Sequence, residues 1–152
     1  ALWEALLADK IDVIATDHAP HTIQEKNNTY FKAPSGGPLV QHSLVAMLEM
    51  SRKGFITPEK VVQKMCHAPA DLFRIKDRGY IREGYFADLV LIDPKKSWVV
   101  SPENILYKCG WSPFDGLEFS HKVDTTFVNG KIVFANDQIK SGFTGERVTF
   151  NM

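Results

Sequence analysis

The side chains of Asp17, His18 and His21 are the ones in this 152-residue chain whose types and spacing could do chemistry. They follow the apolar run 11–16 (Ile-Asp-Val-Ile-Ala-Thr), which lacks helical periodicity and predicts a buried strand of a parallel sheet. α/β enzymes place their reactive groups at the C-terminal ends of such strands. A carboxylate there can take up and return a proton, and an imidazole can bind an anion. On these residues alone, a plain strand-to-turn junction with Asp17 and Pro20 as turn residues stays open.

A second group of candidates closes the long polar segment 17–38, which ends in Ala33-Pro34-Ser35-Gly36-Gly37-Pro38. A loop of that length within a domain is usually functional. Ser35, Gly36 and Gly37 could offer backbone N–H groups to a ligand, because glycine lets a ligand approach the main chain closely. The alternative is an ordinary turn from a loop into a helix. Structural roles are expected for the remaining histidines, which lie in or beside helices or begin a strand: His42, His67 and His121.

Composition excludes several classes of protein. The formal net charge is zero, so the chain lacks the excess of positive charge that binds nucleic acid or an anionic membrane. No apolar stretch approaches the roughly 20 residues that a membrane span requires. Cys66 and Cys109 lack the spacing of metal ligands and are too few for a disulfide framework. We therefore expect free thiols in a cytoplasmic protein.

The elements that must position these residues change in type along the chain. Helical apolar spacing predicts helices over 1–9, 39–52 and 58–66, with a short one over 69–73. Thr57-Pro58 is a typical helix start. The later chain favours strands over 87–93, 97–100 and 121–135, and Asn129-Gly130 in the last of these predicts a hairpin. We expect two units, 1–75 and 76–152. The helical start without an initiating Met indicates the C-terminal part of a longer polypeptide.

Four blocks in order resemble the cyclic amidohydrolases, and most closely the bacterial dihydroorotases. Residues 16–21 (Thr-Asp-His-Ala-Pro-His) are similar to the motif at the end of that family's eighth barrel strand. Residues 33–38 are similar to its substrate-contacting loop, although the family usually has an aromatic residue at Ser35 and Glu at Gln41. Residues 79–93 resemble the signature of the small appended β-sandwich, and 112–116 with 126–130 continue it.

The resemblance implies a fold class and roles for individual residues. The fold would be α/β, the C-terminal part of a metal-dependent hydrolase (β/α)8 TIM barrel followed by a composite β-sandwich. Asp17 would be the catalytic residue, lying against the metal centre and moving a proton between the attacking water and the leaving ring nitrogen. His21, Ser35 and Gly36 would bind the substrate. His18 could face away, because neighbouring side chains of an extended segment point apart.

The resemblance also implies a metal that this chain holds only in part. One or two Zn²⁺ ions would be the cofactor, with Asp17 as the single ligand from these residues. A hydrolytic zinc takes about three protein ligands, and a whole barrel takes roughly 250 residues. The remaining ligands would lie in the rest of the barrel, from the same polypeptide. The chain alone is therefore expected to be inactive.

Dihydroorotase activity is the leading functional expectation, with N-carbamoyl-L-aspartate and L-dihydroorotate as the small-molecule substrates in pyrimidine biosynthesis. The parent would be a cytoplasmic homodimer with no nucleic-acid or membrane partner. Two alternatives stay open. One is another cyclic amidohydrolase, such as an allantoinase or a hydantoinase. The other is a non-catalytic homologue retained for assembly with another enzyme, although both Asp17 and His21 are intact.

Overall fold

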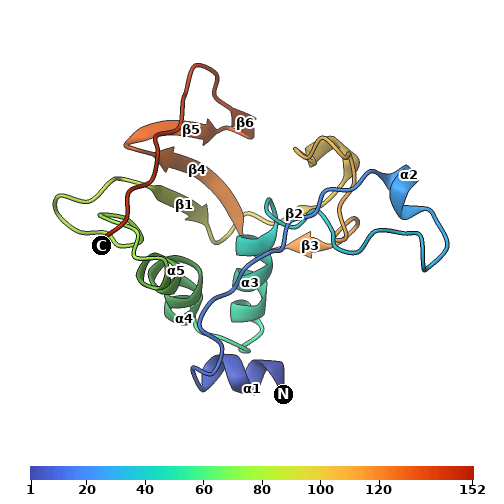
Figure 1. The fold of residues 1–152 in the computed structure, drawn as a ribbon. Helices are drawn as coiled ribbons and strands as arrows, with labels where there is room; N and C mark the ends of the chain where they lie inside the picture. The colour runs from blue at the N-terminus through green and yellow to red at the C-terminus, as the bar shows by residue number, and fades with distance from the viewer.

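The first half of the chain is helical in the computed structural model, which describes all 152 residues. Figure 1 shows α4 (Pro58–Val62) and α5 (Ala68–Leu72) below the larger sheet, whereas α2 (Ile23–Lys26) lies apart on the long loop. The helices of this half are α1 (Leu2–Leu7), α2 (Ile23–Lys26), α3 (Ser43–Arg52), α4 (Pro58–Val62) and α5 (Ala68–Leu72). The predictions for 1–9 and 39–52 are confirmed, with α3 starting later because 39–42 forms a turn.

The predicted helix that begins at Pro58 is also confirmed and is longer than expected. The Thr57 hydroxyl caps it by accepting the Lys60 N–H at 3.2 Å. A π-helical turn, η1 (Gln63–His67), continues α4 directly into α5. π-Helical turns inside helices are rare and widen the helix by one residue per turn. The two short predicted helices are therefore one irregular helix.

The second half forms the predicted strands. β4 (Lys122–Val128) is an inner strand, paired with β1 and β5, of a four-stranded antiparallel sheet in the order β1-β4-β5-β6. Asn129 and Gly130 connect β4 to β5 with φ of 51° and 75°, which are the left-handed angles that a tight hairpin turn needs. The hairpin prediction is therefore confirmed. The other elements are β1 (Leu89–Asp93), β5 (Lys131–Ala135), β6 (Gln138–Ile139), a separate pair β2 (Trp98–Val99) and β3 (Glu118–Phe119), and the 3₁₀ turn η2 (Pro102–Asn104).

The predicted strand over 11–16 is not formed. The segment is extended, but its one backbone hydrogen bond to another element runs from the Ile14 N–H to the Lys64 carbonyl in η1. A parallel strand needs a neighbouring strand on each side, and the only parallel pairing in the structure is the single bridge between His18 and Gly37. The apolar pattern was therefore right for an extended, partly buried segment and wrong for a strand. For the same reason these residues form no barrel.

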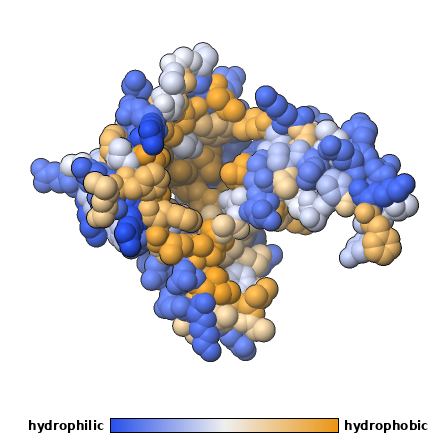
Figure 2. All heavy atoms as spheres, in the orientation of Figure 1, coloured by the Kyte–Doolittle hydropathy of each residue, from blue (hydrophilic) through white to orange (hydrophobic).

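Two small apolar clusters hold the elements together. Leu6, Ile56 and Val61 join α1 to α4. The second cluster joins α3 to the small sheet through Val45, Val100 and Phe119. The solvent-accessible surface is 10543 Å² for 17.1 kDa, whereas a compact monomer of that mass exposes roughly 7,800 Å². Part of the exposed surface is apolar: Figure 2 shows an apolar hollow between the larger sheet and the long loop.

The helices are all too short or too polar to cross a membrane.

Candidate active site

Asp17 lies at the point where the extended segment turns sharply. Its φ is 44°, in the left-handed region that non-glycine residues seldom adopt, although aspartate is among the side chains that tolerate it. The residue is exposed. Its carboxylate takes part in none of the hydrogen bonds or ion pairs of the structure, and it is therefore free to bind a ligand or to move a proton. Unusual backbone angles cluster at functional sites.

His18 is exposed, but it contacts the segment that leads into α3 and has a structural role. Its Nδ1 accepts the backbone N–H groups of Leu39 at 3.1 Å and Val40 at 3.3 Å. The ring centroid lies 5.2 Å from that of Tyr107. Because Nδ1 accepts, the neutral ring carries its proton on Nε2. His18 therefore fixes the start of the segment that leads into α3.

The glycine loop lies directly beside the Asp17 segment. The Ala19 N–H donates to the Gly37 carbonyl at 3.0 Å, next to the bridge between His18 and Gly37. Gly36 has a φ of 85°, and a Cβ added there would lie 2.6 Å from the Cβ of Ala19. Only glycine fits this approach without a shift. The structure thus brings Gly36, a predicted site residue, into contact with the residues that follow Asp17.

A lysine fixes the shape of the same loop. Lys26, at the end of α2, donates from Nζ to the carbonyls of Pro34 at 2.6 Å and Gly36 at 2.9 Å. Ser35 lies between these two carbonyls and is exposed. Its main chain is therefore positioned, but its side chain has no partner in the structure.

His21 is half-buried beside α2. Its Nδ1 lies 3.8 Å from Glu25 Oε2, and its carbonyl accepts the Trp111 indole N–H at 2.8 Å. Glu25 belongs to a capping box with Thr22, and the hydrogen bonds from Thr22 hold the pKa of the Glu25 carboxyl below its ordinary value. The sequence interpretation missed α2, although the pattern Thr22-x-x-Glu25 was the signal that could have found it.

Gln41, at the other end of the loop, holds that loop against the segment 104–107. Its Nε2 donates to the Asn104 carbonyl at 2.8 Å, and its Oε1 accepts the Leu106 N–H at 2.8 Å. Its backbone N–H donates to the Tyr107 hydroxyl at 2.8 Å. The side chain uses both a donor and an acceptor, whereas an ionised carboxylate could only accept and would lose the contact with Asn104. No local pattern indicates contacts over more than 60 residues.

His42 has the structural role that was predicted. It is fully buried, with Nδ1 3.2 Å from Ser112 Oγ and 3.3 Å from the Tyr107 hydroxyl. Burial lowers the pKa of the imidazole, which therefore stays neutral. His67 and His121 also make internal contacts, since the His67 ring stacks on Tyr80 and His121 Nδ1 lies 3.0 Å from Ser120 Oγ.

The chain does not contain a complete set of metal ligands. No group of three or more His, Cys, Asp or Glu side chains is arranged to hold an ion. The free carboxylate of Asp17 is a suitable single oxygen ligand for zinc. A metal bound here would need its other ligands from outside these residues.

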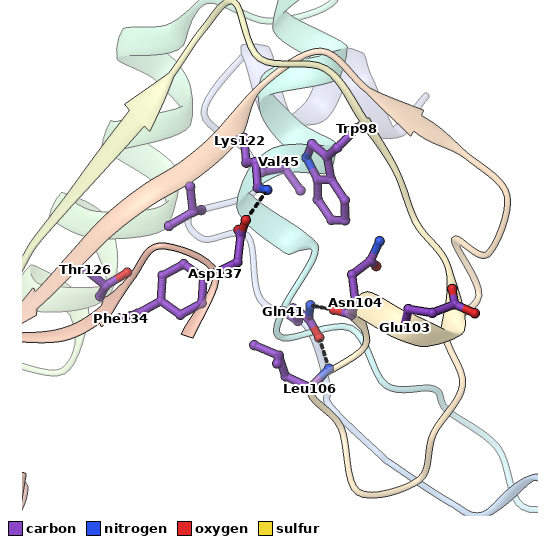
Figure 3. A pocket seen from close by; sticks show the side chains of 11 residues that line it. Gln41, Val45, Trp98, Glu103, Asn104, Leu106, Lys122, Thr126, Phe134 and Asp137 are labelled. Atoms are coloured by element: carbon purple, nitrogen blue, oxygen red, sulfur yellow. Dashed lines mark hydrogen bonds and ion pairs between the residues drawn. The ribbon is translucent and has the colours of Figure 1, made fainter. Parts of the chain in front are cut away.

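A cavity lined by 11 residues lies away from Asp17. It has a volume of about 390 Å³ and opens between the start of α3, β2 and the β4–β6 strands. Figure 3 shows Trp98 and Phe134 on its walls and the Lys122–Asp137 ion pair, 2.7 Å long, at its side. Of the residues around the candidate site, only Gln41 reaches it. The cavity is therefore separate from the predicted site.

Comparison with known proteins assigns the chain to a family. The model of the amidohydrolase family matches residues 1–133, and the chain belongs to that family. A protein named dihydroorotase from Pyrococcus horikoshii is 37% identical over 147 residues, which are 97% of this chain and 34% of that protein. The dihydroorotase of Clostridium acetobutylicum is 42% identical over 135 residues, 88% of this chain and 32% of that protein. The chain thus spans about a third of the curated relatives it matches.

Solved structures agree with this assignment. An L-hydantoinase (dihydropyrimidinase) from Arthrobacter aurescens superposes with a TM-score of 0.85 at 30% identity, over 97% of this chain and 34% of that chain. A D-hydantoinase matches with a TM-score of 0.83 at 23% identity, over 91% and 31% respectively, and supports the fold alone. The predicted family resemblance and the α/β fold class of an amidohydrolase are therefore confirmed.

Proposed function

We propose that this chain is part of a dihydroorotase, an enzyme that interconverts N-carbamoyl-L-aspartate and L-dihydroorotate in pyrimidine biosynthesis. The observation that carries the proposal is the contact between the two predicted site segments. The free carboxylate of Asp17 is two residues from Ala19, and Ala19 touches Gly36 of the glycine loop. The relatives named dihydroorotase support the choice of substrate class.

In this proposal Asp17 is the catalytic residue. Ring opening of a cyclic amide needs a base for the attacking water and then an acid for the departing nitrogen. One exposed carboxylate with no competing partner can do both in turn. His21 would bind the anionic end of the substrate through its imidazole, and the main chain at Ser35 and Gly36 would offer N–H donors.

We propose one or two Zn²⁺ ions as the cofactor, with Asp17 as the ligand from this chain. When bound, such an ion polarises the amide carbonyl and lowers the pKa of water. The other ligands would come from the rest of a (β/α)8 barrel in the same polypeptide. We assign residues 1–75 to that barrel and 76–152 to a β-sandwich domain.

The exposed surface supports further partners for this chain. The surface exceeds that of a compact monomer by about a third, a difference larger than a standard protein interface. We propose that the rest of the barrel covers part of this surface, and that the complete protein is a cytoplasmic homodimer.

A substrate comparison tests the proposed activity. The full-length protein that carries this chain would be assayed with dihydroorotate, hydantoin, dihydrouracil and allantoin, with added zinc and after chelation. We expect turnover of dihydroorotate to exceed that of the other three rings and to be lost on chelation. Preferred turnover of hydantoin or allantoin would replace the dihydroorotase proposal with another cyclic amidohydrolase. No turnover of any ring by metal-loaded protein would favour a non-catalytic assembly role.

A further inference from the structure

A second cavity of about 380 Å³ lies where the end of α5 meets the segment 74–85. Its walls carry Arg74, Arg78 and Arg82, which are three of the five arginines in the chain. The one acidic side chain on these walls is Asp71, whose carboxylate accepts the Tyr80 hydroxyl at 2.6 Å.

Arg78 is held by its neighbours. It forms an ion pair with Asp88 and donates to Asn129 Oδ1 at 2.7 Å, and its guanidinium lies 4.0 Å from the centre of the Phe86 ring. These contacts join the segment before β1 to the β4–β5 turn. Arg78 therefore has a structural role and forms a fixed wall of the cavity.

Arg74 and Arg82 have no carboxylate partner. The ion pairs of arginine in this structure belong to Arg52 and Arg78. The Arg82 guanidinium lies 4.2 Å from the centre of the Tyr80 ring, and His67 stacks on that ring at 4.1 Å. Both faces of Tyr80 are thus covered, so the cavity has no free face of this ring for an aromatic ligand. The groups left to bind a ligand are the guanidinium groups of Arg74 and Arg82, and a guanidinium can donate two parallel hydrogen bonds to an oxyanion.

The backbone at Arg74 gives an independent reason to consider its side chain important. The α5 helix ends in a Schellman motif, with the Arg74 N–H bonded to Asp71 O at 3.1 Å and the Ile75 N–H bonded to Ala70 O at 2.8 Å. Arg74 occupies the left-handed position of this motif, with φ 54°. Glycine is the usual residue there and avoids the steric cost. Arg74 thus lines the cavity from a position that is sterically costly for any residue other than glycine.

We propose that this cavity is a binding site for a small phosphate-bearing anion, with Arg74 and Arg82 each taking one phosphoryl group of a diphosphate. The C-terminal segment closes one side, because the Asn151 N–H donates to the Arg74 carbonyl at 2.8 Å and Asn151 lines the cavity. The cavity shares no lining residue with the candidate active site, so the proposal is independent of the proposed function.

Titration with inorganic pyrophosphate tests the site. Calorimetry on the full chain would compare pyrophosphate, phosphate and sulfate at low and moderate salt. We expect saturable binding with one site, tighter for pyrophosphate than for phosphate and weakest for sulfate. The double variant Arg74→Gln/Arg82→Gln should weaken pyrophosphate binding roughly tenfold or more, because each lost guanidinium removes a charge-assisted hydrogen bond. The control Arg147→Gln, an exposed arginine outside the cavity, should bind as the wild type does.

A measurement on the unmodified chain keeps the test independent of how the variants fold. Arginine modification by phenylglyoxal, followed by peptide mass spectrometry, would be run with and without pyrophosphate. We expect protection at Arg74 and Arg82 and none at Arg147. Equal protection at all three positions, equal affinity for phosphate and pyrophosphate, or an absence of saturable binding would overturn the proposal.

Discussion

Glu49 and Ser120 join the helical and the β parts of the chain through a buried carboxylate. Glu49 Oε2 accepts the Ser120 hydroxyl at 2.7 Å and its backbone N–H at 3.2 Å, while Oε1 accepts Arg52 Nη2 at 2.6 Å. Hydrogen bonds from Arg52, and next from Ser120, lower the pKa of Glu49 to about 2. The charged form of Glu49 is therefore the one that holds α3 against β3.

Replacing this carboxylate should make stability less dependent on acid pH. The folded pKa of Glu49 lies below the ordinary value of 4.5, so its contribution is complete above that pH and is lost as the pH falls toward 2. We expect Glu49→Gln to lose about 1–3 kcal/mol at pH 7 and the difference from wild type to vanish near pH 2. Urea denaturation at several pH values measures this. Glu146→Gln, in the exposed tail, is the control; a constant difference at all pH values would contradict the prediction.

Gly79 and Gly84 allow the cost of close packing to be separated from the cost of backbone angle. Both are left-handed, with φ of 83° and 82°. A Cβ at Gly79 would overlap the Ala70 Cβ and lie 2.9 Å from the Cys66 carbonyl, whereas nothing lies within 4 Å of one at Gly84. We expect Gly84→Ala to cost roughly 1 kcal/mol and Gly79→Ala clearly more. Equal midpoints in chemical denaturation would show that α5 moves freely away from residue 79.

In the full-length protein, Asp17→Asn should lower kcat by about 10²–10⁴, the usual effect of losing a general acid–base group. The amide keeps the size of the side chain but cannot exchange a proton. The matched control is Asp12→Asn, an exposed aspartate of the same segment. Steady-state kinetics with dihydroorotate and metal analysis of both variants measure the effect. A near-normal kcat of the Asp17→Asn variant would show that Asp17 is only a turn residue and not a catalytic one.

Gln41→Glu should destabilise the loop contacts in a pH-dependent way. A carboxylate would face the Asn104 carbonyl, which now accepts the Gln41 amide at 2.8 Å. We expect a loss of about 1–3 kcal/mol at pH 7, which shrinks in acid because a protonated carboxyl can donate again. Gln24→Glu, on the exposed α2, is the control for the added charge. Thermal melts from pH 4 to 8 measure the stability difference between the variant and the wild type. A loss of stability that does not depend on pH would mean that the Asn104 contact is unimportant.

Local signals predicted the elements whose stability comes from a few adjacent residues. Thr57-Pro58 marked the start of α4, and Asn129-Gly130 marked the β4–β5 turn, because hydroxyl caps and left-handed turns depend on neighbours in sequence. Asp17 was a candidate because it follows the apolar run 11–16, and Gly36 because glycine lets a ligand approach the main chain; the structure brings their segments together. The catalytic role of Asp17 is still a prediction.

Elements that depend on distant partners could not be predicted in this way. The segment 11–16 has the apolar pattern of a strand, but pairing is decided by neighbours that its own residues do not specify. The contacts of Gln41 with 104–107 and of Trp111 with His21 join residues more than 60 positions apart. Such contacts produce no periodic pattern in the sequence of either segment.

The small number of buried residues should weaken the dependence of the unfolding free energy on temperature and denaturant. Only 13 of 152 residues are buried, and both the heat-capacity change and the urea m-value of unfolding scale with the area newly exposed. Both quantities should fall below the averages for a chain of this length. The free energy of unfolding would then vary gently with temperature, and the melt of the isolated chain would be broad.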